Sequence, residues 1–245
     1  MSSVTTEAGS EGRVHGVRIA DPFGIIDRRV WNAIHAGWYE AAECIALQRH
    51  LRPGDRVLDI GAGCGVTSVV AARVVGEDAV RCIEANPRLK PLIEHVAQIN
   101  GFTRLSVLSV AAAGASEENA PFHSAESYWA SSVKTPTAAA VRAEITVPAM
   151  SLPALLADFP ANVLSVDVEG GEADLFAQTD LAAIDLVIVE LHPEILPPDD
   201  IGALYAHFIQ SGLFPDPQGM TKPHVAVFRR PTRVRARPKH SVAQH

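Results

Sequence analysis

Short apolar runs alternate with helical patterns along most of the chain. The apolar runs lie at 56–60, 79–85, 104–112, 162–168, 184–191 and 224–230. Between them, apolar residues recur at spacings of three and four after Gly65 and over 89–99, 172–178 and 199–211. Strands that alternate with helices are typical of a parallel sheet with right-handed crossovers, so the pattern predicts an α/β fold.

Three segments depart from this alternation. Residues 28–51 carry a helical apolar stripe, which predicts an N-terminal helical extension. Residues 115–147 alternate polar with apolar positions around a proline-containing link, and we expect an inserted hairpin or flap there. We therefore expect one domain over 28–230, with a flexible N-terminal segment at 1–27 and a disordered basic tail at 231–245.

The charge of the chain is unevenly placed. Residues 229–245 hold six basic residues and no acidic one, which leaves 15 basic against 28 acidic residues in the rest of the 245-residue chain. An acidic body does not suit nucleic acid, and no run approaches the ~20 apolar residues of a membrane-spanning helix. Because the N-terminus lacks the apolar core of a signal peptide, we expect a cytoplasmic protein. We expect neither nucleic acid nor a membrane as its partner.

The most informative motif follows the first apolar run. The strand ends with Asp59 and runs into Gly61, Gly63 and Gly65, which permit a tight turn and a close approach of a ligand to the backbone. Asp59 either orders this turn or meets a cationic amine. Glu84 ends the next strand, where a carboxylate accepts hydrogen bonds from ribose hydroxyls. This pattern predicts a nucleoside-containing ligand.

These residues resemble the class I S-adenosylmethionine-dependent methyltransferases. The resemblance implies a Rossmann-like, doubly wound, mostly parallel seven-stranded sheet whose last strand is antiparallel. It also implies S-adenosylmethionine as the cofactor. The implied cofactor-binding residues are Asp59, Gly61, Ala62, Gly63, Gly65, Glu84, Ala111, Ala112 and Asp167.

Two later motifs resemble the FkbM-type methyltransferases. They are the Asp-x-Glu-Gly-x-Glu segment from Asp167 to Glu172 and the Glu-x-His from Glu190 to His192. This resemblance implies methyl transfer to a hydroxyl of a small molecule, such as a sugar, a polyketide or another secondary metabolite. Members of that family commonly have Asn at the position of Gly63 and Lys at that of Ser165, so the chain departs from the pattern there.

The later carboxylates support more than one role. Residues two apart in a strand share a face, so Asp167 with Glu169, and Glu190 with His192, converge if their strands are neighbours. His192 or Asp167, with Glu169 beside them, would then act as general base. Alternatively, the four side chains hold a divalent metal. A third interpretation is structural: Glu169 and Glu172 only begin the next helix, and His192 ends a strand.

Two other functions compete with methyl transfer. An NAD-dependent dehydrogenase would place Gly or Ala three residues after the second glycine, whereas this loop has the spacing G-x-G-x-G followed by Val66. A non-catalytic nucleoside-binding protein would keep the pocket without the chemistry. Whether the chain forms a homo-oligomer stays open at this stage.

Overall fold

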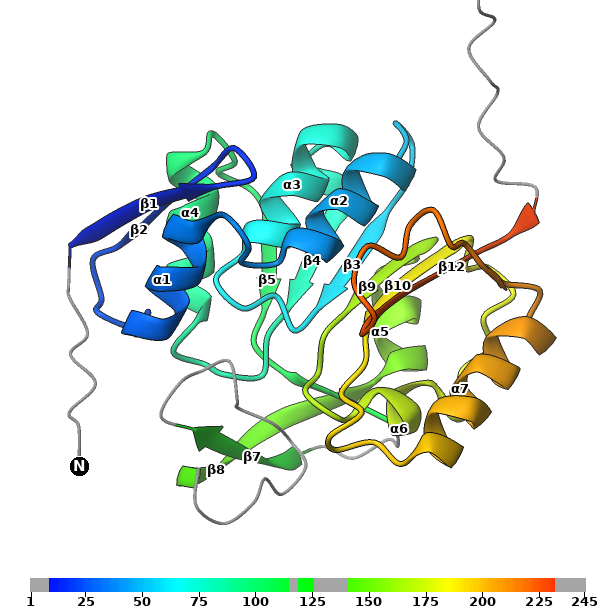
Figure 1. Ribbon diagram of the computed structural model, residues 1–245. Coiled ribbons are helices and arrows are strands. Elements are labelled where there is room, and N and C mark those ends of the chain that lie inside the picture. The colour runs from blue at the N-terminus through cyan, green and yellow to red at the C-terminus, as the bar shows by residue number, and fades with distance from the viewer. Residues whose placement is uncertain (1–8, 115–118, 126–140, 232–245) are drawn as a thin grey trace, which may run out of the picture.

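A seven-stranded sheet forms the centre of the molecule (Figure 1). The computed structural model describes residues 9–114, 119–125 and 141–231. All strands from β10 to β5 in the sheet run parallel, whereas β12 pairs antiparallel with β10, and β11 antiparallel with β12. In spatial order the strands are β11 (Phe214–Pro215), β12 (Val225–Arg229), β10 (Leu186–Glu190), β9 (Val163–Val166), β3 (Val57–Ile60), β4 (Val80–Ile83) and β5 (Ser106–Leu108).

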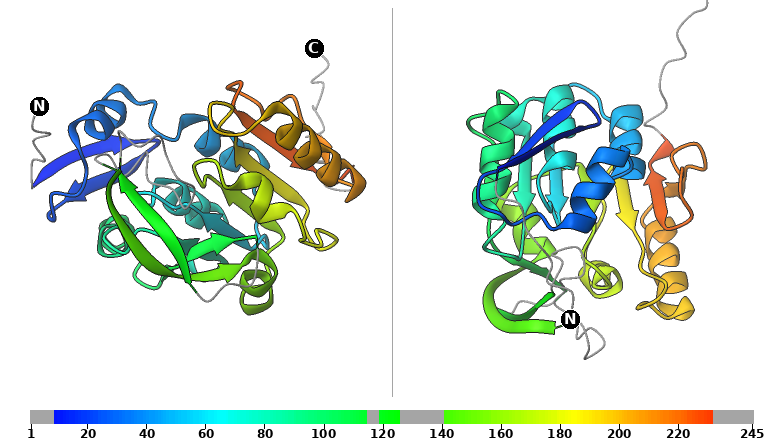
Figure 2. Two further views of the ribbon diagram at one scale, coloured as in Figure 1. Left: turned by 90° about the horizontal axis from the view of Figure 1, so that it is seen from below. Right: turned by 60° about the vertical axis from the view of Figure 1, so that its left-hand side comes forward.

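Helices cover both faces of this sheet, as a doubly wound α/β fold requires (Figures 1 and 2). One face packs against α1 (Arg28–Ala36), α2 (Ala41–His50), α3 (Val66–Val75) and α4 (Lys90–Ile99). The other packs against α5 (Leu152–Asp158), α6 (Glu172–Phe176) and α7 (Pro198–Gln210). A 3₁₀ turn, η1 (Glu77–Ala79), follows α3. Among the described residues, no helix has the length and apolarity needed to cross a bilayer.

The strands read as nearly continuous apolar runs because both of their faces are buried. In β10, Leu186 and Ile188 pack against the first helical layer, while Val187 and Val189 pack against the second. The side chains alternate in direction along the strand, so each run contributes to both cores. The predicted α/β class and the Rossmann-like, mostly parallel sheet are confirmed.

The predicted helix over 28–51 is two helices. Asp27 caps α1 by accepting the backbone N–H groups of Arg29 and Val30, and Gly37 ends it with φ +80. Glu40, with φ +51, then precedes α2. The left-handed residues between the helices break a pattern that the apolar spacing alone shows as continuous.

The N-terminal segment is ordered from residue 9 onward, contrary to the flexible segment expected over 1–27. Strands β1 (Ser10–Val14) and β2 (Val17–Asp21) form an antiparallel hairpin. Val14, Val17 and Ile19 are buried in the first core, which fixes the hairpin against α1 and α4. Residues 1–8 lie outside the described residues.

A second, three-stranded sheet lies beside the carboxyl edge of the main sheet (Figure 2). The run at 104–112 is not one strand: β5 ends at Leu108 and β6 (Ala111–Ala113) leaves the main sheet to pair with β8 (Val141–Ser151). Strand β7 (Asn119–Ala125) pairs antiparallel with β8, as expected for an inserted hairpin. The connection at 126–140 and the basic tail from 232 onward lie outside the described residues.

Candidate functional site

The glycine loop joins β3 to α3 at the carboxyl edge of the sheet. Gly61, Gly63 and Gly65 all have positive φ, at +82, +55 and +83. The N–H groups of Gly61 and Ala62 donate to the carbonyl of Ile83 at 2.9 and 3.2 Å, which ties the loop to the end of β4. A Cβ on Gly61 would lie 1.6 Å from the backbone oxygen of Asp167. Glycine is therefore required here by both the backbone conformation and the close approach of the chain just after β9.

Asp59 orders this loop from inside the protein. Its side chain is 3% exposed and accepts hydrogen bonds from the hydroxyls of Thr67, at 2.7 Å, and Ser68. Burial raises the pKa of Asp59, and the hydrogen bonds from Ser68 and Thr67 oppose that rise. These bonds join the end of β3 to the first turn of α3, and contact of Asp59 with a cationic amine stays a prediction.

Glu84 lies at the end of β4, next to the glycine loop. Its carboxylate accepts the backbone N–H of Gly63 at 3.0 Å and that of Asn86 at 2.8 Å. Burial raises the pKa of Glu84 to about 7, against the lowering effect of these two hydrogen bonds. A carboxylate has about four lone-pair sites, so the held side chain still offers acceptors for ribose hydroxyls. The residues present fit a nucleoside cofactor.

Ala111 and Ala112 lie on β6 and pair with Ala149 and Met150 of β8. Ala111 is fully buried in the core of the small sheet, while Ala112 packs against the second core of the main sheet. The two alanines thus follow β5 at the same edge as the glycine loop. Their contact with an adenine ring stays a prediction.

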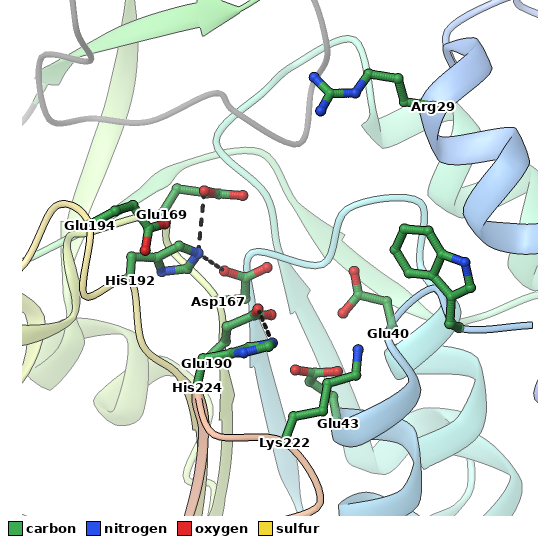
Figure 3. A pocket seen from close by; sticks show the side chains of 11 residues that line it. Arg29, Glu40, Glu43, Asp167, Glu169, Glu190, His192, Glu194, Lys222 and His224 are labelled. Carbon is green, nitrogen blue, oxygen red and sulfur yellow. Dashed lines mark ion pairs between the residues drawn. The ribbon is translucent and has the colours of Figure 1, made fainter.

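A cavity of about 430 Å³ opens next to the ends of β9 and β10 (Figure 3). Among the described residues, six carboxylates line it, against two cationic and two imidazole side chains. The lining residues are Arg29, Trp38, Glu40, Glu43, Asp167, Glu169, Glu190, His192, Glu194, Lys222 and His224. All four of the later polar residues singled out in the sequence are among them, because β9 and β10 are adjacent parallel strands.

His192 is the centre of the polar cluster in this cavity. Its Nε2 lies 3.3 Å from Oε2 of Glu169 and 3.6 Å from Oδ1 of Asp167, while Nδ1 lies 2.8 Å from Oε1 of Glu172. Strand β9 ends at Val166, so strand alternation does not place the two acids on one face as expected. Instead, a turn in which Glu169 has φ +53 and Gly170 has φ +95 returns the Glu169 carboxylate toward His192.

Burial and crowded charge shift the pKa values in this cluster. Burial raises the pKa of Asp167 to about 7, and the charge of His192 opposes that rise. Burial and the charge of Asp167 raise the pKa of Glu169 to about 8. Burial and the charges of Asp167 and Glu43 raise the pKa of Glu190 to about 9. For His192, burial lowers the pKa, but the bond to Glu172 and the nearby carboxylates outweigh it and raise the value to about 10.

Two groups in the cavity have the spacing for a cation. Single ligand atoms of Asp167, Glu169 and His192 lie within 4.8 Å of one another, as do those of Glu40, Asp167 and Glu190. The four residues named for a metal in the sequence therefore fall into two overlapping sets that share Asp167. A divalent metal, which was the alternative to a general base, stays a prediction, since carboxylates also gather without one.

Several lining residues were not among the sequence candidates. Glu40 directly precedes α2 and Glu43 lies on it, while Lys222 and His224 come from the segment before β12. His224 lies 3.3 Å from Glu190. Charged residues on a helix or a loop look like ordinary solvated surface in a sequence, and only the position of α2 against β10 shows that they face a cavity.

A comparison with known protein families shows which family the chain belongs to. Residues 59–211 match the methyltransferase FkbM domain, and this match covers more than half of the chain. The chain belongs to the FkbM methyltransferase family. The matched segment includes both the glycine loop and the turn that holds Asp167 and Glu169. Membership of this family implies S-adenosylmethionine as the cofactor.

Individual relatives match only part of the chain or match it at low identity. The chain is 43% identical to a ribosomal protein L11 methyltransferase from Thermus thermophilus over 56 residues, which is 23% of this chain and 21% of that protein. A candidate SAM-dependent methyltransferase from Streptococcus mutans has a TM-score of 0.50 at 10% identity, covering 93% of this chain and 56% of that one. The ribosomal protein L11 methylase from Lactobacillus delbrueckii subsp. bulgaricus has a TM-score of 0.46 at 13% identity, with 77% of each chain covered.

Proposed function

We propose that this protein is an S-adenosylmethionine-dependent O-methyltransferase that acts on a hydroxyl of a small molecule. Family membership supports the cofactor, and the glycine loop with Glu84 offers the residues to hold it. One observation carries the acceptor assignment. Oδ1 of Asp167 is buried, accepts no hydrogen bond from the described residues, and lies 3.6 Å from Nε2 of His192 in a cavity at the carboxyl edge of the sheet.

Methylation of an alcohol requires that its proton be removed as its oxygen attacks. When bound, S-adenosylmethionine supplies an electrophilic methyl group. Asp167 offers an oxygen for the hydroxyl proton, and its pKa of about 7 suits a base that operates near neutral pH. The positive charge of His192 lowers the pKa of Asp167 and so helps to keep it ionised. We therefore assign proton removal to the Asp167–His192 pair, with Glu169 on the same imidazole nitrogen.

The remaining part of the cavity suits an acceptor with polar groups. Glu190 and His224 form one pair on the β10 side (Figure 3), and Trp38, which is 48% exposed, adds an aromatic ring to the lining. Hydroxylated rings bind to such combinations of polar groups and an aromatic face. These features support a small acceptor of the sugar or polyketide type.

Direct measurement of the product tests this function. The full chain is incubated with methyl-¹³C S-adenosylmethionine and either hydroxylated acceptors (monosaccharides, phenols, polyketide alcohols) or lysine peptides, which represent an amine acceptor. We expect S-adenosylhomocysteine and a methoxy carbon signal with a hydroxylated acceptor. A methyl group found on nitrogen or carbon contradicts the O-methylation, and cofactor binding without S-adenosylhomocysteine from any acceptor indicates a non-catalytic binding protein.

The same assay separates the base from a metal. Treatment with EDTA should leave the rate unchanged if Asp167 and His192 remove the proton unaided. A rate that EDTA abolishes and Mg²⁺ restores would instead assign the cavity carboxylates to a cation that lowers the pKa of the hydroxyl.

A further inference from the structure

One carboxylate behind the site has no role in the proposed reaction. Glu172 is the first residue of α6 and is fully buried, with 0% of its side chain exposed. Its Oε1 accepts the backbone N–H of Gly170 at 3.0 Å and lies 2.8 Å from Nδ1 of His192. Its Oε2 is buried and has no hydrogen-bond partner in the described part of the chain. Because a buried carboxylate is costly unless it is paired, this position calls for a physical reason.

Helix capping does not supply that reason. Carboxylates near a helix start favour the helix dipole, but α6 has only five residues and Asp174, which is exposed, already offers a carboxylate in its first turn. The Glu172 side chain instead reaches His192, which lies 20 residues further along the chain, just after the end of β10. The contact thus joins the turn after β9 to the segment after β10, the two parts that supply the polar cluster.

The contact also determines which imidazole nitrogen faces the cavity. With Nδ1 on Glu172, Nε2 is the nitrogen near Asp167 and Glu169 (Figure 3). A histidine whose Nδ1 bonds to a carboxylate has a fixed ring orientation and a defined donor pattern. Without Glu172, rotation of the ring would move Nε2 away from Asp167.

We propose that Glu172 is a positioning residue, which holds Nδ1 of His192 and thereby directs Nε2 toward Asp167. Its purpose rests on the proposed function, because the Asp167–His192 pair is the assigned proton acceptor. The contact itself is independent of the acceptor, so it is measurable in the protein alone.

Nitrogen NMR of the full chain tests this role. The protein is labelled with ¹⁵N-histidine, kept in metal-free buffer without cofactor, and titrated with pH; the signal of His192 among the ten histidines is identified by its loss in His192→Ala. Glu172→Gln keeps the size of the side chain and an oxygen that accepts both N–H groups, but it removes the charge. Glu172→Met removes the acceptor as well, and Asp174→Asn removes an acid from the same helix without touching His192.

We expect the titration midpoint of His192 to fall by one pH unit or more in Glu172→Gln, which is a tenfold lower proton affinity. In Asp174→Asn the midpoint should stay unchanged. In Glu172→Met the Nδ1 proton signal should also lose its hydrogen-bonded shift. An unchanged midpoint in Glu172→Gln would overturn the proposal and leave Glu172 as a structural residue. If Glu172→Met does not fold, Glu172→Gln still decides the question.

Turnover provides a second readout once an acceptor is found. Glu172→Met, which removes the acceptor for Nδ1 of His192, should lower kcat about tenfold or more, whereas Glu172→Gln, which keeps that acceptor, should lower it less. Both variants should leave the KM for S-adenosylmethionine unchanged, because Glu172 does not line the cavity. Equal falls in kcat in Glu172→Met, Glu172→Gln and Asp174→Asn would contradict a positioning role. A failed acceptor search would count against the proposed function but would not affect the NMR result.

Discussion

Substitution of Gly61 by Ala tests how the glycine loop and β9 fit together. The change has two costs. The backbone has φ +82, where a residue with a Cβ loses roughly 1–2 kcal/mol relative to glycine. The new Cβ would also lie 1.6 Å from the backbone oxygen of Asp167, and relief of such a contact costs about 1–3 kcal/mol. Together these terms predict a loss of about 2–5 kcal/mol in the free energy of unfolding.

A matched control separates the two terms. Gly37 has φ +80, and a Cβ there would meet no atom within 4 Å. Gly37→Ala should therefore cost only the conformational term, roughly 1–2 kcal/mol. Urea unfolding of both variants at one pH, without cofactor, gives the difference directly. If Gly61→Ala is no more destabilising than Gly37→Ala, then the close contact between Gly61 and Asp167 is not what requires glycine in the loop.

Two further predictions follow from the charges. Glu84→Ala should weaken S-adenosylmethionine binding about 10- to 100-fold in calorimetry, because charge-assisted hydrogen bonds are lost. The control Glu94→Ala, which removes an exposed ion pair, should leave the affinity unchanged. Equal affinities of the two variants would contradict the assignment of Glu84 to the ribose. The empty protein should unfold more easily at pH 9 than at pH 6.5. The raised pKa values of Glu169, Glu190 and His192 mean that the folded state binds more protons there, so stability falls as pH rises toward about 9. Thermal unfolding of Glu190→Gln should show a weaker dependence, and stability that rises over this range would contradict the shifts.

Much of the fold could be predicted because its signals are local and repetitive. The strands that become β3, β4, β9, β10 and β12 are short apolar runs with both faces buried, and they lie where the pattern placed them. The hairpin at 10–21 was missed because its strands carry few apolar positions, which become buried only when α1 and α4 pack against them. The break between α1 and α2 depends on left-handed residues that apolar spacing does not show.

The candidate site could be predicted in part. Asp167, Glu169, Glu190 and His192 share one cavity, as the motif and the parallel strands suggested. The turn at Glu169 and the side-chain direction of Glu172 depend on backbone dihedrals and long-range packing, so no spacing rule reveals them. The same holds for Glu40 and Glu43, whose position depends on how α2 docks on the sheet.

The most direct test of the proposed reaction is single-turnover methyl transfer by Asp167→Asn at saturating S-adenosylmethionine. The substitution keeps the shape of the side chain but removes the oxygen that takes the hydroxyl proton. We predict a rate of S-adenosylhomocysteine formation about 10²- to 10⁴-fold below that of the unmodified protein, with cofactor still bound in calorimetry. A rate equal to that of the unmodified protein would contradict proton removal by the Asp167–His192 pair.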